Sequence, residues 1–156
     1  MTDVAAVNAS PLIYLTGAGQ LDLLRLAGDE VVVPRAVADE VGRWGADDPV
    51  ARALDETPWL KVVPNPTVPP SIQAWDLGAG ETAVLSHALS GRATAILDDR
   101  AGRRCALAHR IPVRGTLGLA SWRRSTERSP RRGHCSSACE NRACTSPTPC
   151  SIEPWR

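Results

Sequence analysis

The sequence contains no phenylalanine, and tyrosine and methionine occur only once each. Aromatic residues make up 4% of the chain, so Leu, Val, Ile and Ala, together with five Trp, must fill any core. No apolar run approaches the roughly 18 residues that a membrane-spanning helix needs. The N-terminal residues also lack the basic segment and apolar stretch of a signal peptide. We therefore expect a cytoplasmic protein that makes no contact with a membrane.

An excess of charge of either sign is also missing, because 18 Lys and Arg oppose 17 Asp and Glu to give a net charge of +1. Bulk charge therefore gives no indication of a nucleic-acid-binding surface. The chain has 156 residues, of which 43% are hydrophobic and 22% are charged. This composition is typical of a soluble protein. A single domain of about 150 residues buries roughly 68–70% of its unfolded surface, so the chain is long enough for one core.

The composition changes sharply near Ser121. Before this point, short apolar runs alternate with amphipathic stretches. After it, large aliphatic residues almost disappear, and Arg, Ser, Pro and Cys dominate. Such a segment cannot bury enough apolar surface to offset the entropy lost when it becomes ordered. We therefore expect a folded domain over residues 1–120 and a disordered tail over residues 121–156.

The first 120 residues alternate between strand patterns and helix patterns. Short apolar or β-branched runs predict strands at residues 4–7, 31–33, 59–63, 93–97 and 111–113. Helices are expected between them, and the first is expected to use Ser10 as its N-cap, with Pro11 at the first helical position. Further helices are expected at 21–26, after Pro34, after Asp48, at 81–89, at 99–109 and from Gly115 onward. Strands separated by helices predict a parallel sheet that is covered on both faces.

Polar side chains lie where the predicted strands end, which is where parallel sheets hold their functional sites. Asn8 follows the first strand, and Asp98 and Asp99 follow the fourth. Glu40 lies on the helix after the second strand, and Glu81 lies in the first turn of its own helix. Their oxygens are the hard ligands that Mg²⁺ and Mn²⁺ prefer. An ion among crowded carboxylates relieves their repulsion, activates water and stabilises charge on a phosphate.

Each of these residues also has an ordinary structural interpretation. Glu81 can complement the dipole of its helix, and Glu40 can be a solvated helix residue. Asp98 and Asp99 can be N-caps, and Asn8 can be a turn residue. No single residue is specific for a metal site. Their order along the chain and their shared position at strand ends favour one.

Five segments resemble the motifs of PIN-domain proteins, in the family's order and spacing. The first contains Asn-Ala-Ser-Pro-Leu-Ile, which is typical of an uncharacterised prokaryotic branch related to VapC toxins. The resemblance extends over residues 3–120, and its segments are 7–15, 33–41, 77–83, 96–101 and 113–119. It implies a three-layer α/β/α sandwich with a central parallel sheet. It also implies a Mg²⁺- or Mn²⁺-dependent ribonuclease activity.

The resemblance implies a role for each polar residue at the strand ends. Glu40, Glu81 and Asp99 would be the catalytic acids and metal ligands, with Asp98 as an adjacent metal ligand. PIN nucleases usually carry Asp at the position of Asn8, although this branch commonly shows Asn. An Asn side chain keeps one oxygen ligand but loses a charge. We therefore expect Asn8 to be a metal ligand that lowers the affinity for the ion.

Further residues and the partners complete the prediction. Ser10 resembles the small polar residue that supports the site in the family. Arg100, Arg103 and Arg104 could contact a substrate phosphate, although a solvated helix face is the favoured interpretation. The expected partners are an RNA substrate, a small antitoxin protein and a second copy of the chain.

The main functional hypothesis is an endoribonuclease that acts as the toxin of a toxin–antitoxin pair. The alternative is a catalytically weak or inactive PIN-like module that binds nucleic acid or protein. A flavodoxin-like domain that binds a small molecule is disfavoured, because no glycine-rich phosphate-binding turn follows the first strand. Cys105 is expected to be a core residue.

Family sequences normally continue with a further helical region that carries a Tyr-Leu-Ser-Asp motif, which residues 121–156 lack. A back-translation with freely chosen codons yields an amphipathic segment with this motif in a neighbouring reading frame. We therefore interpret the tail as the product of a frameshift. A basic RNA-binding arm is one alternative, and a zinc site is another, formed by His134 with Cys135, Cys139, Cys144 and Cys150. The cysteine spacing lacks the paired C-x2-C units of a strong zinc signal.

Overall fold

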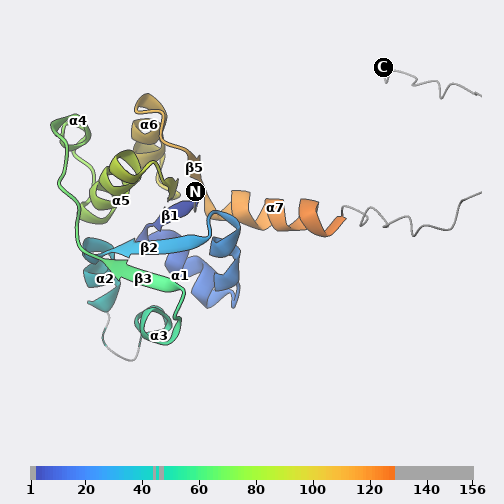
Figure 1. Cartoon of the computed structure of the whole chain (residues 1–156). Coiled ribbons are helices and arrows are strands. Elements are labelled where there is room, and N and C mark those ends of the chain that lie inside the picture. The colour runs from blue at the N-terminus through green and yellow to red at the C-terminus, as the bar shows by residue number, and fades with distance from the viewer. Residues whose placement is uncertain (1–2, 44, 46–47, 129–156) are drawn as a thin grey trace, which may run out of the picture.

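Five parallel strands form the centre of the fold (Figure 1). The structure is a computed structural model that describes residues 3–43, 45 and 48–128. Neighbouring strands pair in the order β3-β2-β1-β4-β5, and every pair is parallel. Their bounds are β1 Val4–Val7, β2 Glu30–Pro34, β3 Leu60–Val63, β4 Thr94–Ile96 and β5 Val113–Arg114. The predicted parallel sheet is therefore confirmed.

Helices cover both faces of this sheet, which gives the expected three-layer α/β/α sandwich. In Figure 1, α5 and α6 lie above the sheet, and α1 and α3 lie below it. α5 packs on β1, β2 and β4, whereas the 3-10 helix η1 packs on β2 and contacts α1 and α7. The helices are α1 Ala9–Gly17, η1 Leu21–Leu26, α2 Arg35–Gly42, α3 Pro49–Glu56, α4 Pro70–Gln73, α5 Ala79–Gly91, α6 Arg100–Ala108 and α7 Thr116–Arg128.

The core is built from branched aliphatic residues and alanine, as the absence of phenylalanine requires. Val31 and Val33 of β2 are buried, as are Ala5 and Ala6 of β1. The small side chains of β1 allow helices to approach the central strand closely. Cys105 of α6 is fully buried, so the prediction that it is a core residue is confirmed.

Several element bounds differ from the sequence-based predictions, most of them by one or two residues. α1 begins at Ala9, with Asn8 rather than Ser10 at the N-cap position. Pro11 is tolerated there because the amide groups of a first helical turn have no acceptor within the helix. No element is expected between residues 63 and 81, but this proline-rich stretch contains the short helix α4, in which Ile72 is buried. β5 begins at Val113 rather than at Ile111.

The expected domain boundary at residue 120 falls inside α7, which continues to Arg128. The rest of the expected tail, residues 129–156, lies outside the described residues, and so do His134 and the four cysteines that follow it. Within the described part of the chain, no helix combines the length and the hydrophobicity needed to cross a membrane.

Gly28 precedes β2 at a point where a side chain has no room. A Cβ atom at this position would lie 2.5 Å from the backbone oxygen of Asp3 and 3.1 Å from the amide nitrogen of Ala5. We expect Gly28→Ala to lower the free energy of unfolding by about 1–3 kcal/mol, because backbone rather than a flexible side chain must move. Denaturant unfolding measures this loss.

Gly17→Ala is the matched control for this prediction. No atom lies within 4 Å of a Cβ at Gly17, and the residue ends α1. Alanine is better than glycine in a helix, so this variant should be as stable as the wild type or slightly more stable. Equal stabilities for the two variants would contradict the close approach at Gly28.

Candidate functional site

The candidate site lies where the strand order reverses, because β2 and β3 are added on one side of β1 and β4 and β5 on the other. β1 is central and has β2 on one side and β4 on the other. In parallel sheets, ligands bind beyond the carboxyl ends of the strands at such a point. Asn8 directly follows β1, and its backbone N–H donates a 3.0 Å hydrogen bond to the carbonyl oxygen of Ile96, the last residue of β4. This bond brings Asn8 close to the chain segment that carries Asp98 and Asp99.

Asn8 has a buried amide oxygen without a hydrogen-bond partner among the described residues. The side chain is only 6% exposed, and it does not cap α1 although it occupies the N-cap position. An unsatisfied buried acceptor costs about 1–3 kcal/mol and therefore calls for an explanation. A cation that this oxygen can bind would supply one.

Glu40 of α2 and Asn8 approach each other over Gly80 of α5, because glycine has no side chain that would fill this space. A Cβ atom on Gly80 would lie 2.8 Å from Oε2 of Glu40 and 3.0 Å from Oδ1 of Asn8. The two oxygens therefore face the same point above the first turn of α5. No sequence pattern assigned a role to Gly80, whose only signal was the Gly-Ala-Gly run before Glu81.

Glu81 is held next to both of the other acids. Burial raises the pKa of its carboxyl above the ordinary value of 4.5, and the nearby charges of Asp99 and Glu40 raise it further. A hydrogen bond from the Gly78 amide acts in the opposite direction. Repulsion of this kind develops only where carboxylates are crowded. The charges of Glu40 and Asp99, which are far from Glu81 in the sequence, therefore act on Glu81 in the fold.

Asp99 combines this position with a structural role. Its Oδ2 accepts a 2.9 Å hydrogen bond from the amide of Gly102, so it is the N-cap of α6. A Cβ on Gly102 would lie 3.9 Å both from that oxygen and from the carboxyl carbon of Glu81. The capping interpretation and the proximity to Glu81 therefore both hold for Asp99.

Asp98 is engaged in a structural contact with α7. Its Oδ1 accepts a 2.8 Å hydrogen bond from the amide of Thr116, and its Oδ2 accepts a 2.5 Å bond from the Thr116 hydroxyl. Both carboxylate oxygens therefore stabilise the start of α7. This arrangement favours Asp98 as a residue that positions the end of β4, and leaves Asp99 as the acid that faces Glu81.

The remaining residues expected at the site lie on α1 and α6. Ser10 is half-buried in the first turn of α1. Arg100 and Arg103 are exposed on α6, and Nη1 of Arg103 lies 2.6 Å from where a Cβ on Gly115 would stand. Arg103 therefore reaches toward the junction of β5 and α7, where Asp98 is also found.

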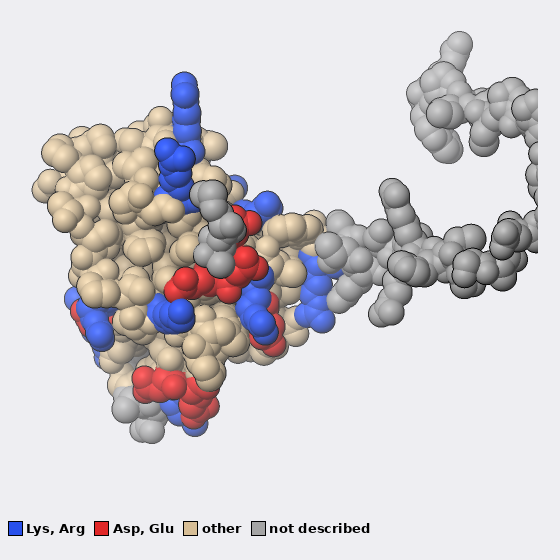
Figure 2. Space-filling view, viewed as in Figure 1, with Lys and Arg blue, Asp and Glu red and all other residues tan. Residues whose placement is uncertain are grey.

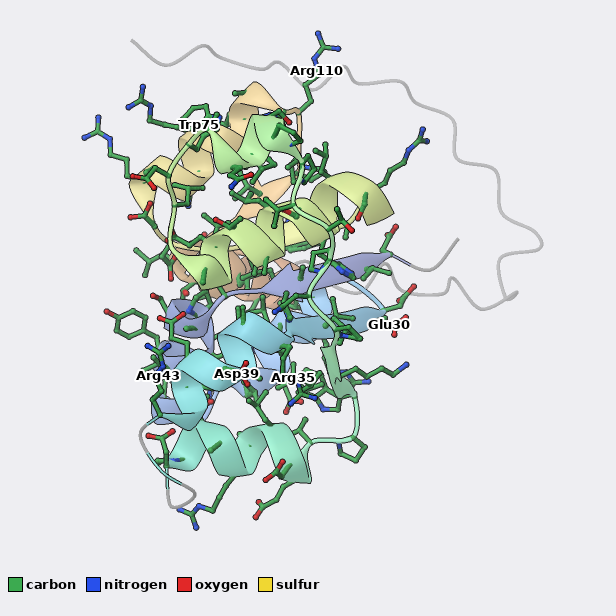
Figure 3. All side chains as sticks on the ribbon, turned by 90° about the vertical axis from the view of Figure 1, so that its left-hand side faces the viewer. Glu30, Arg35, Asp39, Arg43, Trp75 and Arg110 are labelled. Carbon is green, nitrogen blue, oxygen red and sulfur yellow. The ribbon has the colours of Figure 1, made fainter. Side chains whose placement is uncertain are left out.

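The molecular surface mixes both signs of charge. Acidic and basic side chains lie side by side on the face shown in Figure 2. Arg35, Asp39 and Arg43 follow one another at four-residue spacing along α2 and its C-cap, and all three are exposed (Figure 3). Asp39 is next to Glu40 in the sequence but is not among the charges that raise the pKa of Glu81, so it provides a matched control for the cluster.

The donor set suits a hard divalent cation, although its members are not gathered into a finished cage. Asn8, Glu40, Glu81 and Asp99 offer only oxygen ligands, and the orphaned oxygen of Asn8 is one of them. Among the described residues, no three His, Cys, Asp or Glu side chains lie close enough to hold an ion alone. Mg²⁺ in proteins usually keeps several waters and uses only one or two carboxylates. The residues present therefore fit such an ion.

The raised pKa of Glu81 predicts a pH-dependent change in stability when Glu81 is replaced by Gln. The folded chain binds the Glu81 proton more tightly than the unfolded chain does. The ionised carboxyl therefore lowers stability as the pH rises above 4.5 through the folded pKa. In EDTA at pH 7, we expect Glu81→Gln to be more stable than the wild type, by less than about 1 kcal/mol because solvent screens this partly exposed group.

Denaturant unfolding at pH 7 and at pH 4 measures this effect. The advantage of Glu81→Gln should shrink as the wild-type carboxyl takes up its proton. Asp39→Asn removes an acid outside the cluster and should show no comparable gain. A stabilisation that is the same at both pH values would contradict the crowding of carboxylates around Glu81.

Comparison with known proteins identifies the family of this chain. A family model described as DUF3368, a PIN domain, matches residues 4–126. A comparison with curated proteins returns no match. Among solved structures, the chain is similar to a chain of the crystal structure of VapBC2 from Rickettsia felis bound to a DNA fragment from their promoter. That alignment has a TM-score of 0.50 and 12% identity, and covers 72% of this chain and 98% of the other.

Proposed function

Because the chain belongs to the PIN-domain family, we propose that it is a metal-dependent endoribonuclease. The observation that supports this most strongly is that the charges of Asp99 and Glu40 both act on Glu81, while Gly80 leaves room for Glu40 beside the unpartnered oxygen of Asn8. Four separate segments of the chain contribute these side chains. Phosphodiester hydrolysis by metal ions uses an oxygen-rich site of this type.

Glu81 and Asp99 would hold the ion, with Asn8 and Glu40 contributing from the other side of Gly80. A bound Mg²⁺ or Mn²⁺ would supply an activated water and stabilise charge on the phosphate. The chain's own residues prepare this site. Gly78 donates to Glu81, Gly102 donates to Asp99, and Gly80 leaves room for Glu40. Ser10 would support Asn8 from the same turn of α1.

Asp98 contributes indirectly in this proposal. Its two hydrogen bonds to Thr116 fix the backbone at the end of β4. The next residue is Asp99, so this anchor also sets where the Asp99 carboxylate stands. Arg100 and Arg103, in the first turns of α6, are the nearest cations along the chain and would face the substrate phosphate.

We further propose that the nuclease is the toxin of a toxin–antitoxin pair. The VapC-like motifs and the similarity to a chain of the VapBC2 structure support this assignment. An antitoxin protein would then be a binding partner, and a homodimer is a further candidate assembly. Induced expression in bacteria should arrest growth, and Asp99→Asn should relieve the arrest. Arrest by both forms would show that growth inhibition does not come from this site.

A non-catalytic binding module is the second candidate function. Two observations favour it, namely the neutral Asn8 and the lack of a group of three ionisable ligands in the described residues. Incubation of RNA with the purified chain, in Mn²⁺ and in EDTA, separates the two candidates. The nuclease proposal expects cleavage in Mn²⁺ that EDTA abolishes and that Asp99→Asn lacks. Tight RNA binding without cleavage would favour the binding module.

A further inference from the structure

A pocket lies at the end of the sheet opposite the acidic cluster, where β1, β2 and β4 begin. Its volume is about 350 Å³, at the small end of the range for ligand sites. Asp3 lines it directly before β1, whereas Asn8 follows β1, so the strand separates the two sites by about 16 Å. We call it the amino-edge pocket, and the residues that define it are Asp3, Arg25, Asp29, Arg92, Arg114 and Trp122.

Three arginines from three separate segments line this pocket, namely from η1, from the end of α5 and from β5. Among the residues that the structure describes, the only ion pair joins Lys61 and Glu30, so none of the three arginines is paired with a carboxylate. Asp3 and Asp29 also line the pocket, but the arginines outnumber them. Like charges around one pocket repel one another, and a bound anion relieves that repulsion.

Two of the arginines are held over indole rings. The guanidinium carbon of Arg114 lies 4.3 Å from the centroid of the Trp122 ring, and that of Arg25 lies 5.7 Å from the centroid of the Trp59 ring. Stacking of this kind restricts a guanidinium group through its face and leaves the N–H groups at its edge able to donate. An anion that binds here therefore requires less ordering of side chains than one that recruits mobile arginines.

The third arginine, Arg92, occupies a backbone position that favours glycine. It ends α5 with a φ of 51° and a ψ of 37°, in the left-handed region that residues with a Cβ rarely adopt. A cation at a helix C-terminus complements the helix dipole, which is the ordinary interpretation of an arginine here. Arg110 follows α6 with a φ of 56° but does not line the amino-edge pocket. The two residues therefore share the structural role and differ in their access to the pocket.

We propose that the amino-edge pocket binds a compact anion with two linked phosphate groups. A guanidinium group presents its N–H donors in a planar fork that matches phosphate oxygens. Forks from three segments suit a ligand that carries more charged oxygens than a single carboxylate does. Inorganic diphosphate and the diphosphate group of a nucleotide share this chemistry. The site is separate from the acidic cluster, so the inference does not depend on the proposed nuclease function.

Calorimetric titration of the full chain with inorganic diphosphate tests this proposal. EDTA is present throughout, so that no divalent ion carries diphosphate to the acidic cluster. Further arms use inorganic phosphate, sulfate and adenosine diphosphate at the same ionic strength, because salt screens contacts of this kind. We expect diphosphate to bind more tightly than phosphate or sulfate. Equal affinity for adenosine diphosphate would assign the site to the diphosphate group alone, and tighter binding would assign it to a nucleotide.

Arg92→Gly and Arg114→Gln should each weaken the binding of diphosphate by roughly 10- to 100-fold, because each removes charge-assisted hydrogen bonds. Glycine suits the left-handed backbone, so Arg92→Gly should not lower the midpoint of thermal unfolding. Arg110→Gly is the matched control, at the residue labelled at the top of Figure 3, and should leave both the midpoint and the affinity unaffected. Asp29→Asn removes a negative charge from the pocket wall and should tighten binding by up to about fivefold.

Three results would overturn the proposal. The first is an equal loss of affinity in Arg110→Gly, which would show that net charge rather than this pocket determines binding. The second is sulfate that binds as tightly as diphosphate, or a wild type that binds neither. The third is single-stranded RNA whose affinity falls in Arg92→Gly although diphosphate does not bind, which would identify an RNA contact instead. If Arg114→Gln does not fold, Arg92→Gly and Asp29→Asn still decide, because their expected effects have opposite signs.

Discussion

Asp99→Asn should lower the rate of metal-dependent RNA cleavage by roughly 10²–10³-fold while leaving the fold intact. Asn is as good an N-cap as Asp, so the hydrogen bond from the Gly102 amide to this side chain is retained. What the change removes is one negative charge beside Glu81. The loss of activity therefore reports the charge of the cluster rather than the stability of α6.

Asp39→Asn is the matched control for this variant. Asp39 is an exposed acid on α2, adjacent in sequence to Glu40 but outside the cluster. Both variants are purified in the same way and compared in the cleavage of total RNA, with circular dichroism to confirm that each is folded. Asp39→Asn should match the wild type. Equal activity for Asp99→Asn would show that the observed cleavage does not use this site.

Asn8→Asp should tighten the binding of Mn²⁺ by at least about tenfold, which corresponds to about 1.4 kcal/mol. The unpartnered Oδ1 of Asn8 faces the same point as the Glu40 carboxylate, so an added charge acts directly on an ion held there. Without metal, the same charge is buried beside other carboxylates and should lower the stability of the fold. The gain in affinity and the loss of stability in EDTA are expected together.

Asn65→Asp makes the same chemical change away from the cluster. Oδ1 of Asn65 accepts a 2.7 Å hydrogen bond from the amide of Ala36 at the start of α2, where a negative charge is favourable. This control should change neither the affinity for Mn²⁺ nor the stability of the fold in EDTA. If both variants bind Mn²⁺ as the wild type does, the side chain of Asn8 is not a ligand.

Most of the fold could be predicted from patterns that act over short distances. Val31–Val33 reads as a buried strand because β-branched side chains suit a sheet that is covered on both faces. Asp48 before Pro49 predicts the start of α3, and its Oδ1 does accept from the amides of Val50 and Ala51. The helix α4 could not be predicted, because a single turn held by the burial of Ile72 leaves no periodic signal.

Only part of the candidate site could be predicted from the sequence in this way. The rule for strand ends selects Asn8 and Asp99, which come after the neighbouring strands β1 and β4. The contact of Asp98 with Thr116 spans 18 residues, and no local pattern distinguishes this aspartate from the next one. The close approach of Gly80 to Glu40 and Asn8 depends on how α2 and α5 pack, which only the folded chain reveals.

We retain the frameshift as a proposal for the sequence beyond residue 120. The PIN-domain match ends at residue 126, and residues 129–156 lie outside the described residues. Determination of the nucleotide sequence around codon 120 tests the proposal. An open neighbouring frame that encodes the Tyr-Leu-Ser-Asp motif is expected. Stop codons throughout that frame would reject it.

Calorimetric titration of Mn²⁺ into the wild type, Glu81→Gln and Asp39→Asn tests the central claim most directly, because it requires no knowledge of the RNA substrate. We expect the wild type and Asp39→Asn to bind the ion equally. Glu81→Gln should bind it at least about tenfold more weakly, since loss even of an outer-shell partner commonly costs this much. Equal affinity for all three proteins, or no binding by the wild type, would contradict a metal site at this cluster.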